Sequence, residues 1–156
     1  MNLPEKYAIV VYGIFSFMVF IKGVHQSIIK KNPYGQTTFL FWMGIFVWGD
    51  AVILGPFWFL SSFVSYLLKD WYLFLLVISV YWTIRSLGET IYWLNHQFSS
   101  KDNSNFYKGL MGYSFFKSNA ILFVYQVFLQ CITVVSIITT IYFANLWLSI
   151  LFACRS

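Results

Sequence analysis

Four long runs of hydrophobic residues, separated by short polar stretches, set the pattern of this chain. The runs cover approximately residues 7–29, 38–68, 70–98 and 119–145. A helix needs about 20 apolar residues to cross the hydrocarbon core of a bilayer, which is about 30 Å thick. The pattern therefore predicts an all-α membrane protein, a four-transmembrane-helix bundle with up-down topology that forms a single integral membrane domain over residues 1–156.

The breaks between the first three runs contain residues that end or bend helices. Pro33 cannot continue a helix, so the first run stops before it. The connection at Lys69 and Asp70 is so short that the second and third runs should form an antiparallel hairpin, with Asp70 capping the third helix. Gly55 and Pro56 lie inside the second run and predict a kink in its helix.

The last run is longer than one membrane crossing requires. It has no charged residue from residue 119 until Arg155. A helix of that length must tilt strongly or end early. We expect the crossing to finish near Asn145, with the residues that follow at the far interface.

Composition supports the membrane assignment. The chain has 156 residues, of which 60% are hydrophobic and 10% are charged, whereas about 25% of the residues of a soluble domain are charged. The net charge is +5, but the basic residues are scattered between the hydrophobic runs. We therefore expect the lipid bilayer as a partner and no nucleic acid.

The basic residues also predict an orientation. The two loops at one end of the bundle contain Lys30, Lys31, Lys101, Lys108 and Lys117, and the other end contains Lys6, Lys69 and Arg155. Cytoplasmic loops carry an excess of Lys and Arg. The sequence predicts a cell-membrane or inner-membrane protein with loops 30–37 and 99–118 in the cytoplasm and both termini outside.

Ionisable residues interrupt the third run on one helical face. The face contains Tyr81, Arg85, Glu89, Tyr92 and His96. An ionisable side chain in the centre of a membrane helix costs about 2.5–3.5 kcal/mol on insertion scales, so such residues usually face protein and have partners. Arg85 and Glu89 are four residues apart, the spacing of an ion pair within one helix.

Polar residues of all four runs fall in the half of the membrane nearer the lysine-rich loops, if residues are counted inward at 1.5 Å each. The predicted ligand-binding or ion-pair cluster comprises Asp50, Arg85, Glu89, His96, His25, Lys22, Gln126, Gln130 and Tyr92. In the fourth run the polar residues Asn119, Gln126, Gln130, Thr133 and Thr140 share a face. Each of these residues also has a structural interpretation, as an interhelical hydrogen bond, an ion pair or an interfacial side chain.

Three functions fit this pattern. The first is binding or transport of a small polar ligand, a lipid or an ion. Because four helices are few for a complete transporter, we expect a homodimer in this case. The second is an intramembrane enzyme that acts on a lipid-like substrate through Glu89, His96 and Asp50. The third is an accessory or structural subunit of a larger membrane complex. The sequence leaves the cofactor unknown, and no spacing of His, Cys or acidic residues predicts a metal site.

Overall fold

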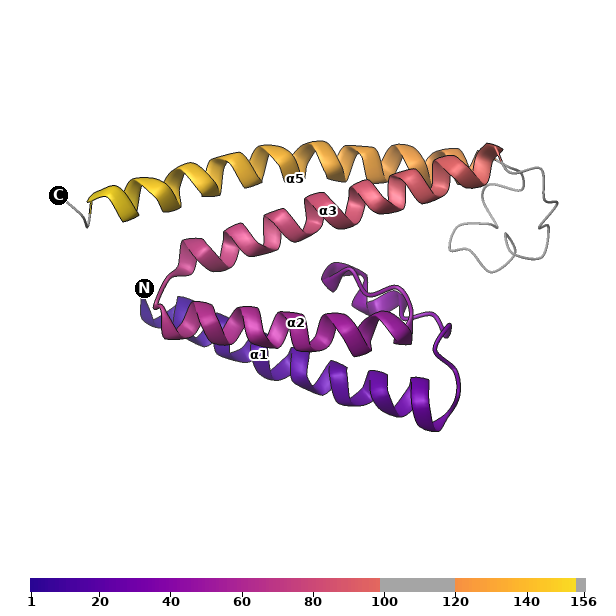
Figure 1. The fold of residues 1–156 in the computed structure, drawn as a ribbon, viewed down its shortest axis with the longest axis horizontal. Helices are drawn as coiled ribbons and strands as arrows, with labels where there is room; N and C mark the ends of the chain where they lie inside the picture. The colour runs from indigo at the N-terminus through magenta and orange to yellow at the C-terminus, as the bar shows by residue number, and fades with distance from the viewer. Residues whose placement is uncertain (99–119, 154–156) are drawn as a thin grey trace. The chain divides into compact units, whose positions relative to one another are not determined.

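The computed structural model describes residues 1–98 and 120–153. Its helices are α1 (Leu3–Val24), a π-helical turn (His25–Ile29), a 3₁₀ helix η2 (Thr38–Met43), α2 (Trp48–Leu67), α3 (Trp71–Phe98) and α5 (Ala120–Ala153), shown in Figure 1. Within the described ranges no β-strand forms, and Gln36 and Val47 make an isolated antiparallel bridge. Among the described residues, four helices are long and apolar enough to cross a membrane, which confirms the all-helical prediction and agrees with four candidate spans.

The chain divides into two compact units, which are described separately. The first unit contains Met1–Ile78 and the stretch from Phe143 onward, and the second contains the described part of Ser79–Tyr142. Helices α3 and α5 each contribute residues to both units. The up-down order of all four helices and the single bundle stay predictions.

In the first unit, α1 and α2 pack against each other through small residues, in antiparallel directions. A Cβ atom placed on Gly23 would lie 2.7 Å from Cβ of Ala51, and one placed on Gly55 would lie 2.7 Å from Cβ of Phe20. Small residues allow helix backbones to approach closely where no hydrophobic effect drives their association, as in a bilayer. Gly55 is therefore part of the helix contact, whereas a kink at the following Pro56 stays a prediction.

The chain between these two helices folds back along them and forms what we call the fold-back segment, residues 33–49 (Figure 1). Its 3₁₀ helix has about three residues per turn, so side chains three apart share a face. Thr37, Leu40 and Met43 follow this spacing and are almost fully buried. Phe39 and Trp42 form a second stripe and remain exposed.

Two sets of contacts hold the fold-back segment in place. At its tip, the indole N–H of Trp58 donates to the carbonyl oxygen of Met43 over 3.1 Å. The ring of Trp42 stacks on Phe15 at 5.5 Å and meets Tyr12 edge-on at 5.7 Å. At its base, the backbone N–H of Gly49 donates to the carbonyl oxygen of Pro33 over 2.8 Å. The tip is therefore fixed to α1 and α2, and the two ends of the segment are fixed to each other at the base.

The fold-back segment corrects the prediction of one helix from residue 38 to residue 68. Helix α2 begins at Trp48, and the residues before it include Gly44 with a left-handed backbone (φ 72°) and Val47 with an extended one. The predicted run is longer than one membrane crossing requires, which is about 20 residues. The excess residues instead bury one side of a 3₁₀ helix.

Helix α5 extends past Asn145, and the expected end of the membrane crossing near that residue stays a prediction. The helix continues to Ala153, since no Gly or Pro interrupts it and the indole of Trp147 donates a 2.8 Å hydrogen bond to Asp70. The other carboxylate oxygen of Asp70 accepts the backbone N–H of Leu73 over 3.0 Å. This second bond confirms the predicted N-cap of α3.

In the second unit, hydroxyl groups join α3 to α5. Thr133 donates to the hydroxyl of Ser86 over 2.9 Å, and the hydroxyls of Thr83 and Thr140 lie 3.3 Å apart. Both Ser86 and Thr133 are buried. The residue numbers rise on one helix as they fall on the other, so this part of α3 and α5 is antiparallel.

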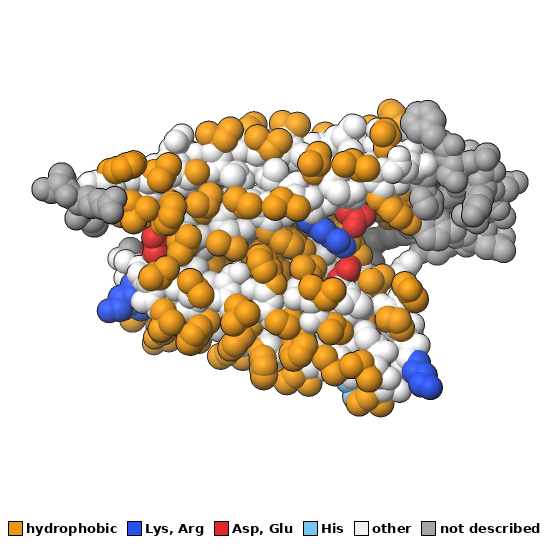
Figure 2. All heavy atoms as spheres, in the orientation of Figure 1, with side chains coloured by type: hydrophobic (Ala, Val, Ile, Leu, Met, Phe, Trp, Pro, Cys, Tyr) orange, Lys and Arg blue, Asp and Glu red, His pale blue; other side chains and the backbone are white. Residues whose placement is uncertain are grey.

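The surface of these helices is predominantly apolar. Figure 2 shows hydrophobic side chains across most of the visible face and few charged ones. Large side chains such as Ile53, Ile84 and Ile138 are more than half exposed. Soluble monomers rarely expose contiguous apolar surface on this scale, so the four apolar helices suggest an integral membrane protein.

Candidate ligand pocket on helix α3

The charged pair of the third run forms as the sequence predicts. Nη2 of Arg85 lies 3.2 Å from Oε1 of Glu89, one turn later on α3. The two side chains are 27% and 21% exposed, so the pair is neither fully buried nor free in solvent. Because an uncompensated charge is costly in a membrane helix, the pairing explains how both residues can occupy this position.

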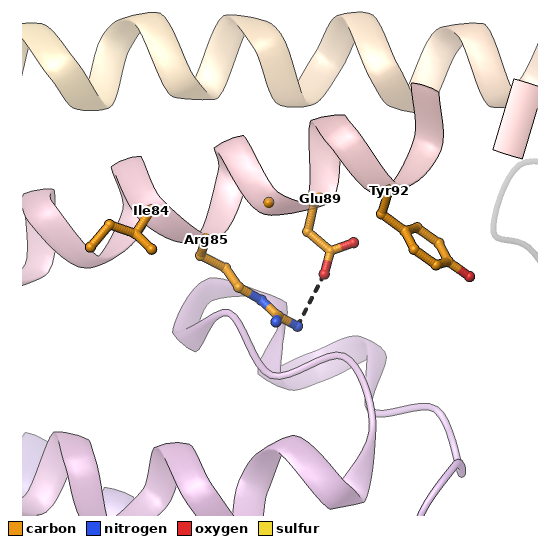
Figure 3. Close-up of a pocket in the computed structure, with 5 residues that line it drawn as sticks. Ile84, Arg85, Glu89 and Tyr92 are labelled. Carbon is orange, nitrogen blue, oxygen red and sulfur yellow. Dashed lines mark ion pairs between the residues drawn. The ribbon is translucent and has the colours of Figure 1, made fainter. Parts of the chain in front are cut away.

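A pocket of about 380 Å³ lies beside the pair, and those of its lining residues that the structure describes belong to α3. They are Ile84, Arg85, Gly88, Glu89 and Tyr92. Figure 3 shows Arg85 and Glu89 projecting from the helix with the ion pair between them, and the Tyr92 ring beyond Glu89. We call this the α3 pocket. It brings together Arg85, Glu89 and Tyr92 of the predicted cluster.

Gly88 lies in the middle of the pocket wall. A Cβ atom placed on it would meet no other atom within 4 Å, so helix packing does not require glycine here. Glycine inside a helix costs about 1 kcal/mol relative to alanine. The missing side chain keeps space open between the turn that contains Arg85 and the turn that contains Tyr92.

Asp50 has a structural role at the start of α2. One of its carboxylate oxygens accepts the backbone N–H groups of Phe46 and Val47, over 3.1 and 3.4 Å. It stands in the first turn of the helix, where a negative charge also interacts favourably with the helix dipole. Asp50 therefore fixes the return of the fold-back segment into α2.

Lys22 and His25 lie near the end of α1, in the first unit. The ammonium group of Lys22 stands over the rings of Phe39 and Trp48, at 5.5 and 5.2 Å from their centres. His25 begins the π-helical turn and is exposed. Since the α3 pocket belongs to the second unit, the single cluster of all predicted polar residues stays a prediction.

The predicted polar face of the fourth run is only partly on the inside of the second unit. Gln126 is buried at 9% exposure and Thr133 at 8%, whereas Gln130 is exposed. The ring of Tyr125 stacks on Trp93 at 5.0 Å. Asn119 and the side chain of His96 lie outside the described residues. In the part of the chain that the structure describes, threonine hydroxyls join α5 to α3, and the hydrogen bonds expected from the glutamines stay a prediction.

Sequence reasoning missed the α3 partners of these threonines, Ser86 and Thr83. Their signal was available, because Ser79, Thr83, Ser86 and Thr90 recur at helical spacing on α3. The charged residues Arg85 and Glu89 lie in the same stretch of α3 and gave the stronger signal. In the described ranges no three His, Cys, Asp or Glu side chains gather as a metal ion would require.

The comparisons with known proteins bring no further assignment. No protein-family model, no curated protein and no solved structure matches this chain. The function is therefore inferred from the geometry alone.

Proposed function

We propose that this chain is an integral membrane protein that binds a small polar molecule or the polar group of a lipid in the α3 pocket. The observation that carries the proposal is the partly exposed Arg85–Glu89 ion pair in the wall of a pocket on a membrane-length helix. Intramembrane ionisable residues mark binding sites and transport pathways more often than other positions do.

The chemistry of the pocket favours a ligand with both acceptor and donor groups. The Arg85 guanidinium donates hydrogen bonds and attracts an anionic group, whereas the Glu89 carboxylate accepts them and attracts a cationic group. The two groups are adjacent, so a zwitterionic or amide-like ligand could contact both. The Tyr92 hydroxyl adds a third polar group on the same wall.

The position of Gly88 supports a binding role over a purely structural one. An ion pair that only stabilises a helix needs no open space beside it. Here the residue between its two turns has no side chain, and a Cβ atom placed on it would meet no neighbouring side chain of the described residues within 4 Å. The lining includes both the charged pair and the apolar side chain of Ile84, which suits a ligand with a polar and an apolar part.

Native mass spectrometry of the purified protein, released from mild detergent without added ligand, tests the proposal. We expect an additional mass on the wild-type chain that is lost in Glu89→Gln and in Gly88→Leu. The first variant removes the charge, and the second fills the pocket while retaining the ion pair. Leu87→Ala, at an exposed α3 position outside the pocket, is the matched control and should retain the mass.

The two variants separate binding from structure. If Gly88→Leu keeps the additional mass, or the wild type carries none, the α3 pocket is not the binding site. If Glu89→Gln instead changes which other chains copurify, the ion pair serves assembly with a partner subunit, and the accessory role replaces the binding role.

The orientation and assembly that the sequence predicts belong to the same proposal. We place the lysine-rich loops 30–37 and 99–118 in the cytoplasm and both termini outside, and we expect a homodimer. Cysteine introduced at Lys31 should react with a membrane-impermeant reagent only from the cytoplasmic side. Labelling from the outside would show that the protein has the opposite orientation.

A further inference from the structure

The ammonium group of Lys22 is held at the base of the fold-back segment by two aromatic rings. It stands 5.5 Å from the centre of the Phe39 ring and 5.2 Å from that of the Trp48 ring. The side chain of Lys22 is exposed, and in the part of the chain that the structure describes it forms no ion pair. A fixed, exposed cation is therefore available to an anionic group.

The level of Lys22 corresponds to the edge of the hydrocarbon core. Helix α2 has 20 residues, which at 1.5 Å per residue is about 30 Å, the thickness of that core. Trp48 begins the helix and so marks one edge, and Lys22 contacts its ring. Phospholipid headgroups begin at this level.

An exposed aromatic stripe runs from Lys22 toward the middle of the membrane. Phe39 lies next to Lys22 and is 59% exposed, and Trp42 follows it on the same face of the 3₁₀ helix with 49% exposure. The neighbouring residue Met43 bonds to Trp58, which lies about 15 Å along α2 from Trp48. The stripe thus covers about half of the hydrocarbon thickness.

We propose that Lys22, Phe39 and Trp42 form a binding site for one anionic phospholipid. The lipid phosphate contacts the Lys22 ammonium, and one acyl chain lies along the Phe39–Trp42 stripe. Charge complementarity selects the occupant. Lys30 and Lys31 are exposed at the same end of α1, and the carboxylate of Asp50 is directed to backbone N–H groups of the fold-back segment.

The residues of this site belong to the first unit, and the described residues of the α3 pocket belong to the second. This site goes beyond the proposed function, because a lipid held on the fold-back segment would cover an apolar face rather than enter a pocket. The two proposals can fail independently.

Lipid titrations by native mass spectrometry test the site. Phosphatidylglycerol and phosphatidylcholine with identical acyl chains are added to the wild type and to Lys22→Gln. We expect the wild type to bind phosphatidylglycerol more tightly than phosphatidylcholine. In Lys22→Gln the ratio of the two affinities should fall about fivefold, which is the effect of one lysine near an anionic membrane surface. Lys69→Gln, an exposed lysine at the α2–α3 turn, is the control and should retain the preference.

Two further measurements separate the contribution of the acyl chain from that of the phosphate. Trp42→Ala should weaken both lipids alike, because it shortens the surface for the acyl chain and leaves the cation in place. Inorganic phosphate should not displace the lipid, since it has no acyl chain. The proposal is overturned if the wild type binds both lipids equally, if Lys22→Gln and Lys69→Gln have the same effect, or if phosphate competes. Melting temperatures equal to that of the wild type ensure that the two lysine variants are folded, and a cooperative melting transition does so for Trp42→Ala, which loses contacts with Tyr12 and Phe15.

Discussion

The indole N–H of Trp58, in the middle of α2, donates a hydrogen bond to the carbonyl oxygen of Met43 at the end of the 3₁₀ helix. Both residues are buried. In a bilayer an exposed backbone carbonyl has no water to bond with, so non-helical chain is tolerated at this depth only where protein satisfies it. The Trp58–Met43 contact satisfies one of the backbone carbonyls of the non-helical fold-back segment.

Removal of this donor should loosen the fold-back segment. Trp58→Phe keeps an aromatic ring against Tyr12, with which Trp58 makes an edge contact at 5.6 Å, but it leaves the Met43 carbonyl without its donor. We expect a loss of about 1–3 kcal/mol, the cost of an unsatisfied buried polar group. Thermal unfolding in detergent and hydrogen exchange of residues 37–47 measure it. Trp71→Phe is the control, and equal effects of the two substitutions would contradict this role.

The glycines of α1 and α3 should respond to alanine in opposite directions. Gly23→Ala places a Cβ 2.7 Å from Cβ of Ala51 and 3.1 Å from its carbonyl carbon, which cannot move without moving the backbone of α2. Overpacking of this kind costs about 1–3 kcal/mol. Gly88→Ala meets no atom within 4 Å and gains up to about 1 kcal/mol of helix propensity. Melting temperatures that fall for both variants would refute the contrast.

The parts of the fold that sequence reasoning predicted are those fixed by local chemistry. Helix α1 with its π-helical turn ends at Ile29 because Pro33 follows, and Asp70 caps α3 by its own carboxylate. Arg85 and Glu89 were predicted to meet because four residues on one helix bring side chains together whatever surrounds them. None of these features depends on a distant segment.

The parts that were missed depend on contacts between segments far apart in the chain. Residues 38–47 are apolar, so their composition fits a membrane helix and a buried 3₁₀ helix equally well. Only the spacing of Thr37, Leu40 and Met43, together with Gly44, distinguishes a period of three from one of 3.6. The roles of Asp50 and Lys22 follow from this fold-back and could not be predicted without it.

The hydroxyl contacts between α3 and α5 should contribute a small but measurable coupling. The hydroxyls of Ser86 and Thr133 lie 2.9 Å apart, and the carbonyl oxygen of Leu129 lies 2.8 Å from the same Thr133 hydroxyl and shares its single proton. A double-mutant cycle with Ser86→Ala and Thr133→Val should give about 0.6 kcal/mol, the average for such bonds in membranes. Thr139→Val replaces Thr133→Val in the control cycle, because the Thr139 hydroxyl bonds only to carbonyls of α5 in the described part of the chain. Equal coupling in both cycles would rule out the Ser86–Thr133 contribution.

Asp70 joins two functions in one carboxylate, and the two oxygens can be tested separately. Oδ1 accepts the N–H of Leu73 and caps α3, whereas Oδ2 accepts the indole N–H of Trp147 on α5. Asp70→Asn retains one carbonyl oxygen for the cap but replaces the other acceptor with an amide donor, so it breaks the Trp147 bond. Asp70→Ala removes both.

We therefore expect Asp70→Asn and Trp147→Phe to destabilise the protein by similar amounts, about 1.5–3 kcal/mol for a hydrogen bond to a charged group. Combining the two should cost little more than either alone, because they remove the same bond. Asp70→Ala should lower the free energy of unfolding by a further ~0.5–2 kcal/mol, as loss of an N-cap does. Additive effects of Asp70→Asn and Trp147→Phe in reversible unfolding would show that α5 beyond Asn145 is not fixed through this bond.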